Sequence, residues 1–353
     1  MTMDLTYFYE NQLLYILILA FFGGITLFLY IQYARPAFGK RDRSLSLDEV
    51  AHGVSIVLCV KNEYENLVRL LPALLEQEYG SFEIVVVDKN SEDDTEVLLA
   101  SLEHFHKNLT IRTLSADAKF GRDDLMALGL GIRAARYPYV IFFRPDCLPS
   151  SRKWLVSLVK TALEKKADTV LGYTSFKGSS LHVRHGMMEQ QMHQMGATRK
   201  KMPYVPWGNN TLFPKERFLS GKEFETRTTA WNQSEQAIIA HILEKDSTNA
   251  CVYPCGSVIM NRRLPAGEYH MNRLQGLCTM ALTKSRGYCF LTLEKVLIAA
   301  FYILLALAFA RIGINGDFLL MVIPGGLLLL RWITVWILYM GFGIHFNEKG
   351  LAY

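Results

Sequence analysis

Three short polar runs carry residues that could do chemistry, and each stands at the end of an apolar run. Lys61-Asn62-Glu63 follows VSIVLCV, Asp88-Lys89-Asn90 closes FEIVVVD, and Arg144-Pro145-Asp146 follows YVIFF. Carboxylates hold divalent cations, whereas arginine grips phosphate through two parallel hydrogen bonds. Together these runs predict a site for a phosphate-bearing ligand, and they leave open whether a metal ion takes part.

The elements that must position these runs are expected to alternate between strands and helices. The apolar runs predict strands at 54–60, 82–88, 109–114, 139–143 and 168–173, and the segments between them predict helices at 63–79, 91–105, 123–137 and 150–166. Ser91 is expected to cap the second of these helices. This alternation implies βαβ units and a mainly parallel sheet, which binds ligands at the carboxyl ends of its strands. The three polar runs are therefore expected to meet in a nucleotide-type cleft.

Three further apolar runs, at 13–31, 296–310 and 318–342, are expected to lie in a membrane, and the first is about as long as a bilayer is thick. Arginines and lysines follow the first run at 35–43. The positive-inside rule therefore places the amino terminus outside and the central region in the cytoplasm. We expect an anchor at 1–34, a basic linker at 35–52, a cytoplasmic domain at 53–290, and two closing helices with a tail at 291–353. The expected location is the inner (plasma) membrane.

Composition limits the classes of partner that the protein is expected to bind. Half of the residues are hydrophobic and the formal net charge is +5. That charge suits contact with anionic membrane lipids, but it is too small and too scattered for nucleic acid. The six cysteines are expected to be free thiols in a reducing compartment. Cys251 and Cys255 give only a weak zinc signal, so no residue is assigned as a metal ligand.

Several segments, in order and spacing, resemble membrane-bound glycosyltransferases of family 2. They are VSIVLCVKNEYENLVRLLPALLEQEYGSFEIVVVD, GIRAARYPYVIFFRPDCLPSSRKWL, PYVPWGNNTLF and LLRWITVWILYMGFGIHFNEKG. The resemblance runs from about Val54 through the last apolar run. It implies an α/β domain of the GT-A type, with a mainly parallel sheet, joined to three transmembrane helices.

The resemblance also implies a reaction and a site. Members of the family transfer a sugar, with inversion, from a nucleotide-sugar donor to an acceptor such as a polysaccharide, a glycolipid or a lipid-linked glycan. The family's base position falls on Gln236, so the neighbouring Glu235 is the candidate base, and Asp146 is the second candidate catalytic residue. The implied nucleotide-sugar contacts are Asn62, Glu63, Asp88, Lys89, Arg144 and Asp146. The implied acceptor-side residues are Trp207, Asn209, Asn210 and Arg273.

Several positions depart from the family pattern. Lys89 stands where an aspartate is usual, Arg144 replaces the first aspartate of the D-x-D motif, and Gln236 stands where the base is expected. An amide cannot take a proton at neutral pH. The family often uses Mg²⁺ or Mn²⁺, but Arg144 disfavours a cation here.

Two interpretations of these departures stay open. In the first, Lys89 and Arg144 contact the donor diphosphate directly, without metal, and Glu235 acts as the base. In the second, the fold is kept but catalysis is lost, and the protein is a binding or scaffold subunit beside a partner transferase in a cell-envelope glycan assembly.

Arg331 interrupts the last apolar run. A charge deep in a bilayer costs at least ~2.5–3.5 kcal/mol, so Arg331 should face protein or water, or lie near a membrane surface. Trp332, Trp336 and Tyr339 follow it, as at a membrane interface. Arg331 could reach the surface along a bent helix, or it could hold a lipid-linked acceptor.

Overall fold

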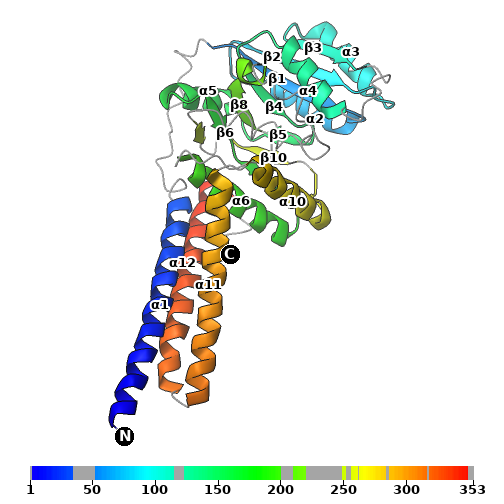
Figure 1. The fold of residues 1–353 in the computed structure, drawn as a ribbon. Coiled ribbons are helices and arrows are strands. Elements are labelled where there is room, and N and C mark those ends of the chain that lie inside the picture. The colour runs from blue at the N-terminus through cyan, green and yellow to red at the C-terminus, as the bar shows by residue number, and fades with distance from the viewer. Residues whose placement is uncertain are drawn as a thin grey trace.

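A computed structural model describes residues 2–34, 52–114, 123–199, 210–219, 249–251, 256–260, 262–283, 286–315 and 318–348. An α/β domain sits on one end of a bundle of three long helices (Figure 1). The amino terminus lies at the end of the bundle away from the domain.

A seven-stranded sheet forms the centre of the domain, in the order β3-β2-β1-β4-β8-β6-β9. The strands are β1 (Val54–Val60), β2 (Phe82–Asp88), β3 (Leu109–Thr113), β4 (Tyr139–Phe143), β6 (Thr169–Leu171), β8 (Thr211–Pro214) and β9 (Asn249–Cys251). Strands β1 to β4 are parallel to one another, β8 is antiparallel to both β4 and β6, and β9 is parallel to β6. The expected mainly parallel sheet is confirmed, and the fifth expected strand is shorter than 168–173.

Apolar strands and amphipathic helices make the core. Strand β1 is almost wholly buried, as expected for a parallel strand covered on both faces. The covering helices are α2 (Tyr64–Leu75), α3 (Thr95–Phe105), α4 (Asp123–Ala134) and α5 (Trp154–Glu164). The expected cap at Ser91 is wrong. Helix α3 begins at Thr95, and the Ser91 hydroxyl instead donates to Asp88 Oδ1 at 2.5 Å.

A second, smaller sheet begins directly after Asp146. It consists of β5 (Cys147–Pro149), β10 (Val258–Met260) and β7 (Thr174–Ser175), with β10 in the middle. Because β10 is antiparallel to β5, with Met260 opposite Cys147, the residues that follow β10 come close to those that precede β5.

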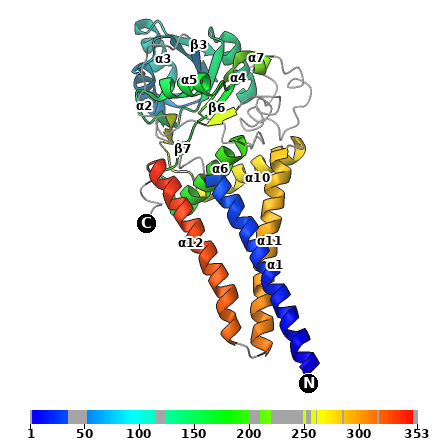
Figure 2. The same ribbon diagram turned by 90° about the vertical axis from the view of Figure 1, so that its left-hand side faces the viewer.

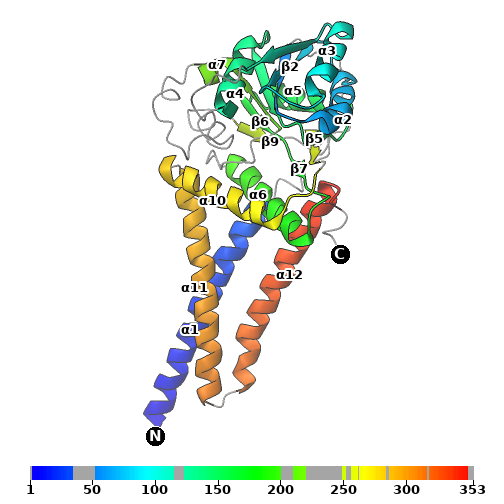
Figure 3. The same ribbon diagram turned by 90° about the vertical axis from the view of Figure 1, so that its right-hand side faces the viewer.

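Two helices, α6 (Leu181–Arg199) and α10 (Ala266–Thr283), lie between the sheet and the bundle (Figure 3). A short helix, α7 (Lys215–Leu219), follows β8. Two residues separate the end of α10 from the start of the next helix, α11 (Arg286–Asn315), which belongs to the bundle. The carboxyl-terminal part of the α/β domain is therefore connected to the bundle through α10.

The bundle consists of α1 (Thr2–Ala34), α11 (Arg286–Asn315) and α12 (Val322–His345), with a short 3-10 turn η4 (Phe318–Met321) before α12 (Figure 2). Three stretches, Leu14–Gln32, Thr292–Ile314 and Val322–His345, are long and apolar enough to cross a membrane. The three expected helices are confirmed. Pro324 lies in the first turn of α12, where proline is tolerated, and the helix continues through it.

Candidate functional site

The Asp146 carboxylate is held by two arginines at the carboxyl end of β4. Arg144 Nε donates to Oδ1 and Arg144 Nη2 to Oδ2, each at 3.0 Å. Arg262, just after β10, donates from Nε to Oδ2 at 2.7 Å. The Asp146 side chain is buried, being only 5% exposed. Strand β4 ends at Phe143, and a turn over Arg144–Cys147, closed by the Cys147 N–H donating to the Arg144 carbonyl at 3.2 Å, brings the two side chains together.

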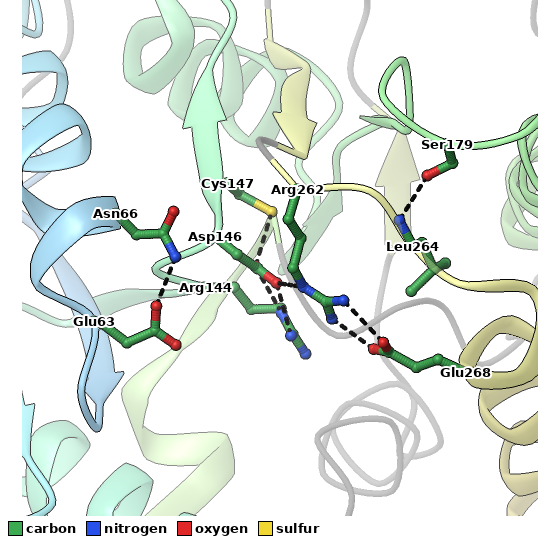
Figure 4. A network of polar contacts seen from close by, with 9 residues as sticks. All are labelled: Glu63, Asn66, Arg144, Asp146, Cys147, Ser179, Arg262, Leu264 and Glu268. Carbon is green, nitrogen blue, oxygen red and sulfur yellow. Dashed lines mark hydrogen bonds and ion pairs between the residues drawn. The ribbon is translucent and has the colours of Figure 1, made fainter.

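Arg262 also binds the first turn of α10. Its Nη1 and Nη2 donate to the two carboxylate oxygens of Glu268 at 2.8 and 2.5 Å. Figure 4 shows the Arg262 guanidinium lying between the carboxylates of Asp146 and Glu268. We call these four residues, Arg144, Asp146, Arg262 and Glu268, the arginine clamp.

The electrostatics of the clamp favour charged forms. Burial raises the pKa of Asp146, but hydrogen bonds and charges from Arg144 and Arg262 outweigh it and hold the pKa below its ordinary value. Hydrogen bonds from Arg262 likewise lower the pKa of Glu268. Bonds to Glu268, and then to Asp146, raise the pKa of Arg262 despite its partial burial. All four groups are therefore charged at neutral pH.

The clamp does not fit a divalent cation as it stands. Both Asp146 oxygens accept hydrogen bonds from guanidinium groups at 2.7–3.0 Å. A cation there would meet two positive charges, and cation sites are built from several oxygen ligands instead. In the described part of the chain, no three histidine, cysteine or acidic side chains gather as a metal-binding group.

A second polar cluster joins the ends of β1 and β2. Asn62 adopts a positive φ of 54°, a conformation that asparagine tolerates better than most residues. The side-chain oxygen of Asn62 accepts from the Glu92 backbone N–H at 2.8 Å, and the backbone N–H of Asn62 donates to the Ser91 hydroxyl at 2.9 Å. Asp88 in turn accepts from Ser91. These bonds tie the loop after β1 to the loop after β2.

Glu63 and Lys89 belong to the same loops. Glu63 Oε2 accepts from Asn66 at 2.7 Å, and the Lys89 backbone N–H donates to the Val60 carbonyl at 2.8 Å. Strand β1 lies between β2 and β4 in the sheet. The sheet thus brings the predicted donor residues Asn62, Glu63, Asp88, Lys89, Arg144 and Asp146 to three neighbouring strand ends.

Asn210 lies inside the fold. Its side chain is fully buried, its oxygen accepts from Trp154 Nε1 at 2.9 Å, and its amide nitrogen donates to the Tyr173 and Gly256 carbonyls. This asparagine therefore positions the start of β8 against α5. Trp207, Asn209 and Glu235 lie outside the described residues.

Arg273 lies on α10, where its Nη1 donates to the Tyr269 hydroxyl at 3.1 Å. It is five residues beyond Glu268 on the same helix. Its predicted role on the acceptor side stays a prediction.

Sequence reasoning missed Arg262 and Glu268. Arg262 is 116 residues from Asp146 along the chain, so only the pairing of β10 with β5 brings the two together. One signal was present, since Arg262-Arg263 follows the apolar run VIM, as the three other polar runs follow apolar strands.

Comparisons with known proteins agree on one family. Residues 55–224 match the model of glycosyl transferase family 2. Glycosyltransferase AglE of Haloferax volcanii is 31% identical over 125 residues, which are 35% of this chain. The match spans only 40% of the length of AglE.

Among solved structures, mannosyltransferase PcManGT from Pyrobaculum calidifontis, in complex with GDP-Man and Mn²⁺, is similar with a TM-score of 0.58. The identity is 16%, and the superposition covers 92% of this chain and 97% of that one. At this identity the likeness speaks for the fold. Residues 55–224 therefore form a domain that matches glycosyl transferase family 2 and has a GT-A-like fold, and the chain also carries three helices that are long and apolar enough to cross a membrane.

Proposed function

We propose that this protein transfers a sugar, with inversion, from a nucleoside-diphosphate sugar to a polysaccharide, glycolipid or lipid-linked acceptor, without a divalent metal. The observation that carries this proposal is the arginine clamp, because it places two guanidinium groups at the strand end where the family resemblance expects a D-x-D motif. PcManGT, which shares the fold, is described in complex with a nucleotide sugar.

The chemistry requires positive charge at this position. The acceptor hydroxyl oxygen forms a bond to the anomeric carbon while the bond from that carbon to the diphosphate breaks. The nucleoside diphosphate leaves with growing negative charge, which preorganised cationic donors stabilise. Arg144 and Arg262 supply those donors, and Asp146 and Glu268 hold them in place. The hydroxyl proton passes to a carboxylate, for which we propose Glu235.

The membrane helices set the place of the reaction. We propose that the α/β domain faces the cytoplasm at the inner membrane, where nucleotide sugars are available. Arginines and lysines follow the first span at 35–43, which favours this orientation.

One observation favours a second function. Asp146 already neutralises Arg144 and Arg262, and Glu268 engages Arg262 a second time. If the carboxylates and arginines of the clamp pair only with one another, the clamp has a structural role. The protein would then be a scaffold subunit beside an active transferase.

Nucleotide binding separates these functions. Calorimetry on detergent-solubilised protein with UDP, GDP and their sugars is expected to show binding in the presence of a chelator. Arg144→Asp is expected to weaken that binding roughly tenfold or more, since hydrogen bonds to charged groups are among the stronger ones. The matched control is Arg152→Asp, because Arg152 pairs with Glu76 on the exposed surface at 2.8 Å.

Two results would contradict the proposal in different ways. Wild-type binding that disappears with chelator and returns with Mn²⁺ would show that Asp146 recruits a metal ion. A lack of binding to every nucleotide, with and without metal, would favour the scaffold.

A further inference from the structure

A cavity of about 710 Å³ lies where the domain meets the bundle. All three bundle helices and α6 contribute to its wall. Its polar and aromatic lining comprises Tyr30 of α1, His185 of α6, Tyr302 of α11, and Arg331, Trp336 and Tyr339 of α12. Two of these lining residues stack on each other, His185 on Tyr339, with ring centroids 4.6 Å apart.

Arg331 is the cation of this cavity, and it is almost fully buried, with 3% exposure. Its Nη1 donates to the Thr26 hydroxyl at 2.6 Å. Its guanidinium carbon lies 5.2–5.6 Å from the ring centroids of Tyr30, Phe301 and Tyr302. Within the described residues, no carboxylate forms an ion pair with Arg331.

Two carboxylates near the domain end of the bundle have partners of their own. Glu189 pairs with Lys295 at 3.5 Å, and Glu294 lies 3.3 Å from His193. A cation within an apolar span needs an anion or good hydrogen bonds, because its desolvation is costly. The Arg331 guanidinium is therefore available to pair with an anion that enters the cavity.

The depth of the Arg331 guanidinium can be read along two neighbouring helices. On α1 it contacts Thr26 and Tyr30, six and two residues before the domain-side end of the first span at Gln32. On α11 it contacts Phe301 and Tyr302, nine and ten residues after the domain-side end of the second span at Thr292. At 1.5 Å per residue these contacts lie roughly 3–15 Å inside the spans, in the domain-side halves of α1 and α11. The wall also opens outward, since Trp332 and Trp336 are 62% and 57% exposed on the bundle surface. A chain could therefore leave the cavity sideways into a membrane.

The cavity is connected to the arginine clamp by one short path. Glu268 of the clamp is followed by Tyr269, whose ring packs against α6 so closely that a Cβ added at Gly186 would lie 2.1 Å from its hydroxyl. Gly186 is the neighbour of His185, which lines the cavity. The cavity thus lies on the membrane side of the proposed donor site, separated from it by α10 and α6.

We propose that this cavity binds the phosphate-bearing head of a lipid acceptor, with Arg331 contacting the phosphate and the lipid chain leaving past Trp332 and Trp336. The proposal rests on the function proposed above and names the acceptor class for it. Guanidinium recognises phosphate by charge and by paired hydrogen bonds. The position beneath the clamp favours an acceptor over a lipid that merely surrounds the bundle.

The test compares four probes on the detergent-solubilised full-length chain: a long-chain polyprenyl phosphate, the matching polyprenol, phosphatidylglycerol and inorganic phosphate. Polyprenyl phosphate is expected to raise the Tm of the wild-type protein, and the other three probes are not. Arg331→Met is expected to weaken the apparent affinity for polyprenyl phosphate roughly tenfold or more. Arg331→Lys keeps the charge, so its apparent affinity for polyprenyl phosphate is expected to fall less than that of Arg331→Met.

Arg311→Met is the matched control, because Arg311 is another arginine of the bundle, stacks on Tyr15 and does not line the cavity. If Arg331→Met does not fold, Arg331→Lys and Trp336→Ala carry the test. An equal response to phosphatidylglycerol would show a general anionic-lipid site, and an unchanged affinity in the Arg331 variants would remove Arg331 from the site. Either result overturns the proposal.

Nucleotide binding, measured by calorimetry on the same preparations, separates the two proposals. Donor binding without lipid-phosphate binding rejects the cavity proposal alone. Loss of donor binding in the wild-type protein rejects the proposed function itself.

Discussion

At the scale of single residues, neighbours decide what a carboxylate can do. Asp146 occupies the strand end where a family 2 enzyme is expected to hold its metal, but here two arginines take both of its oxygens. A carboxylate paired in this way positions cations instead of recruiting one. In the proposed function, the same two arginines are the groups that contact the diphosphate.

This pairing predicts how stability depends on pH. The pKa of Asp146 is below its ordinary value, so its ionised form stabilises the fold above about pH 3.9, and that contribution is lost as pH falls through the lowered folded-state pKa. Asp146→Asn is expected to destabilise by about 1–3 kcal/mol near neutral pH, because it removes the buried carboxylate that accepts hydrogen bonds from Arg144 and Arg262. Thermal unfolding of both proteins should show a constant difference down to about pH 5, and a shrinking one below about pH 4.

Asp168→Asn provides the comparison. Asp168 pairs with Arg217 at 2.9 Å, but the Asp168 side chain is 43% exposed. The free energy of unfolding should therefore fall by less than about 1 kcal/mol. A difference between wild type and Asp146→Asn that grows on acidification would show that Asp146 is protonated in the folded protein.

Two of the four clamp residues, Arg144 and Asp146, were predictable from the sequence, and the other two, Arg262 and Glu268, were not. Arg144 and Asp146 stand two residues apart in sequence at a predicted strand end, and the turn that follows β4 brings their side chains together. Arg262 and Glu268 enter through the pairing of two three-residue strands far apart in sequence. Strands that short leave almost no hydrophobic pattern, so their register cannot be predicted.

At the scale of elements, the same contrast holds. Strands β1, β2 and β4 were predictable because they are continuous buried apolar runs. The antiparallel insertion of β8 between β4 and β6 was not, since no local pattern specifies strand direction. Ser91 illustrates a third case, in which a nearby carboxylate took the hydroxyl that was expected to cap a helix.

The packing of α10 on α6 predicts a strain effect. A methyl group at Gly186 would lie 2.1 Å from the Tyr269 hydroxyl and 2.7 Å from its ring carbon Cζ. Gly186→Ala is therefore expected to push the two helices apart and to cost about 1–3 kcal/mol, which is typical of overpacking. The measurement is thermal unfolding of the detergent-solubilised protein.

Two companions sharpen this test. Tyr269→Phe removes the nearest atom, so the double variant Gly186→Ala/Tyr269→Phe should regain part of the lost stability. Gly267→Ala, on α10 with nothing within 4 Å of the added methyl, should be neutral or slightly stabilising. Equal losses at Gly186 and Gly267 would contradict the packing argument.

At the scale of the whole molecule, the bundle and the domain share a contact at the end of α12. Glu348, buried with 1% exposure, accepts from Arg184 of α6 at 2.9 Å and from the hydroxyl of Ser175 in β7. The last described residues are thus bound to the α/β domain. With three spans, the domain and the end of α12 lie on one side of the membrane and the amino terminus on the other (Figure 2).

The orientation of this arrangement is the last prediction, and it rests on the basic residues that follow the first span. In a cysteine-free background, Lys107→Cys and Lys165→Cys place thiols on exposed positions of the domain. Asp317→Cys places one between the second and third apolar runs, which the same orientation puts on the outer side. An impermeant maleimide applied to intact cells is expected to label position 317 readily. Positions 107 and 165 should react only after permeabilisation, because a domain that uses nucleotide sugars must face the cytoplasm. Ready labelling at 107 and 165, with protection at 317, would reverse the orientation and remove the domain from its proposed donor.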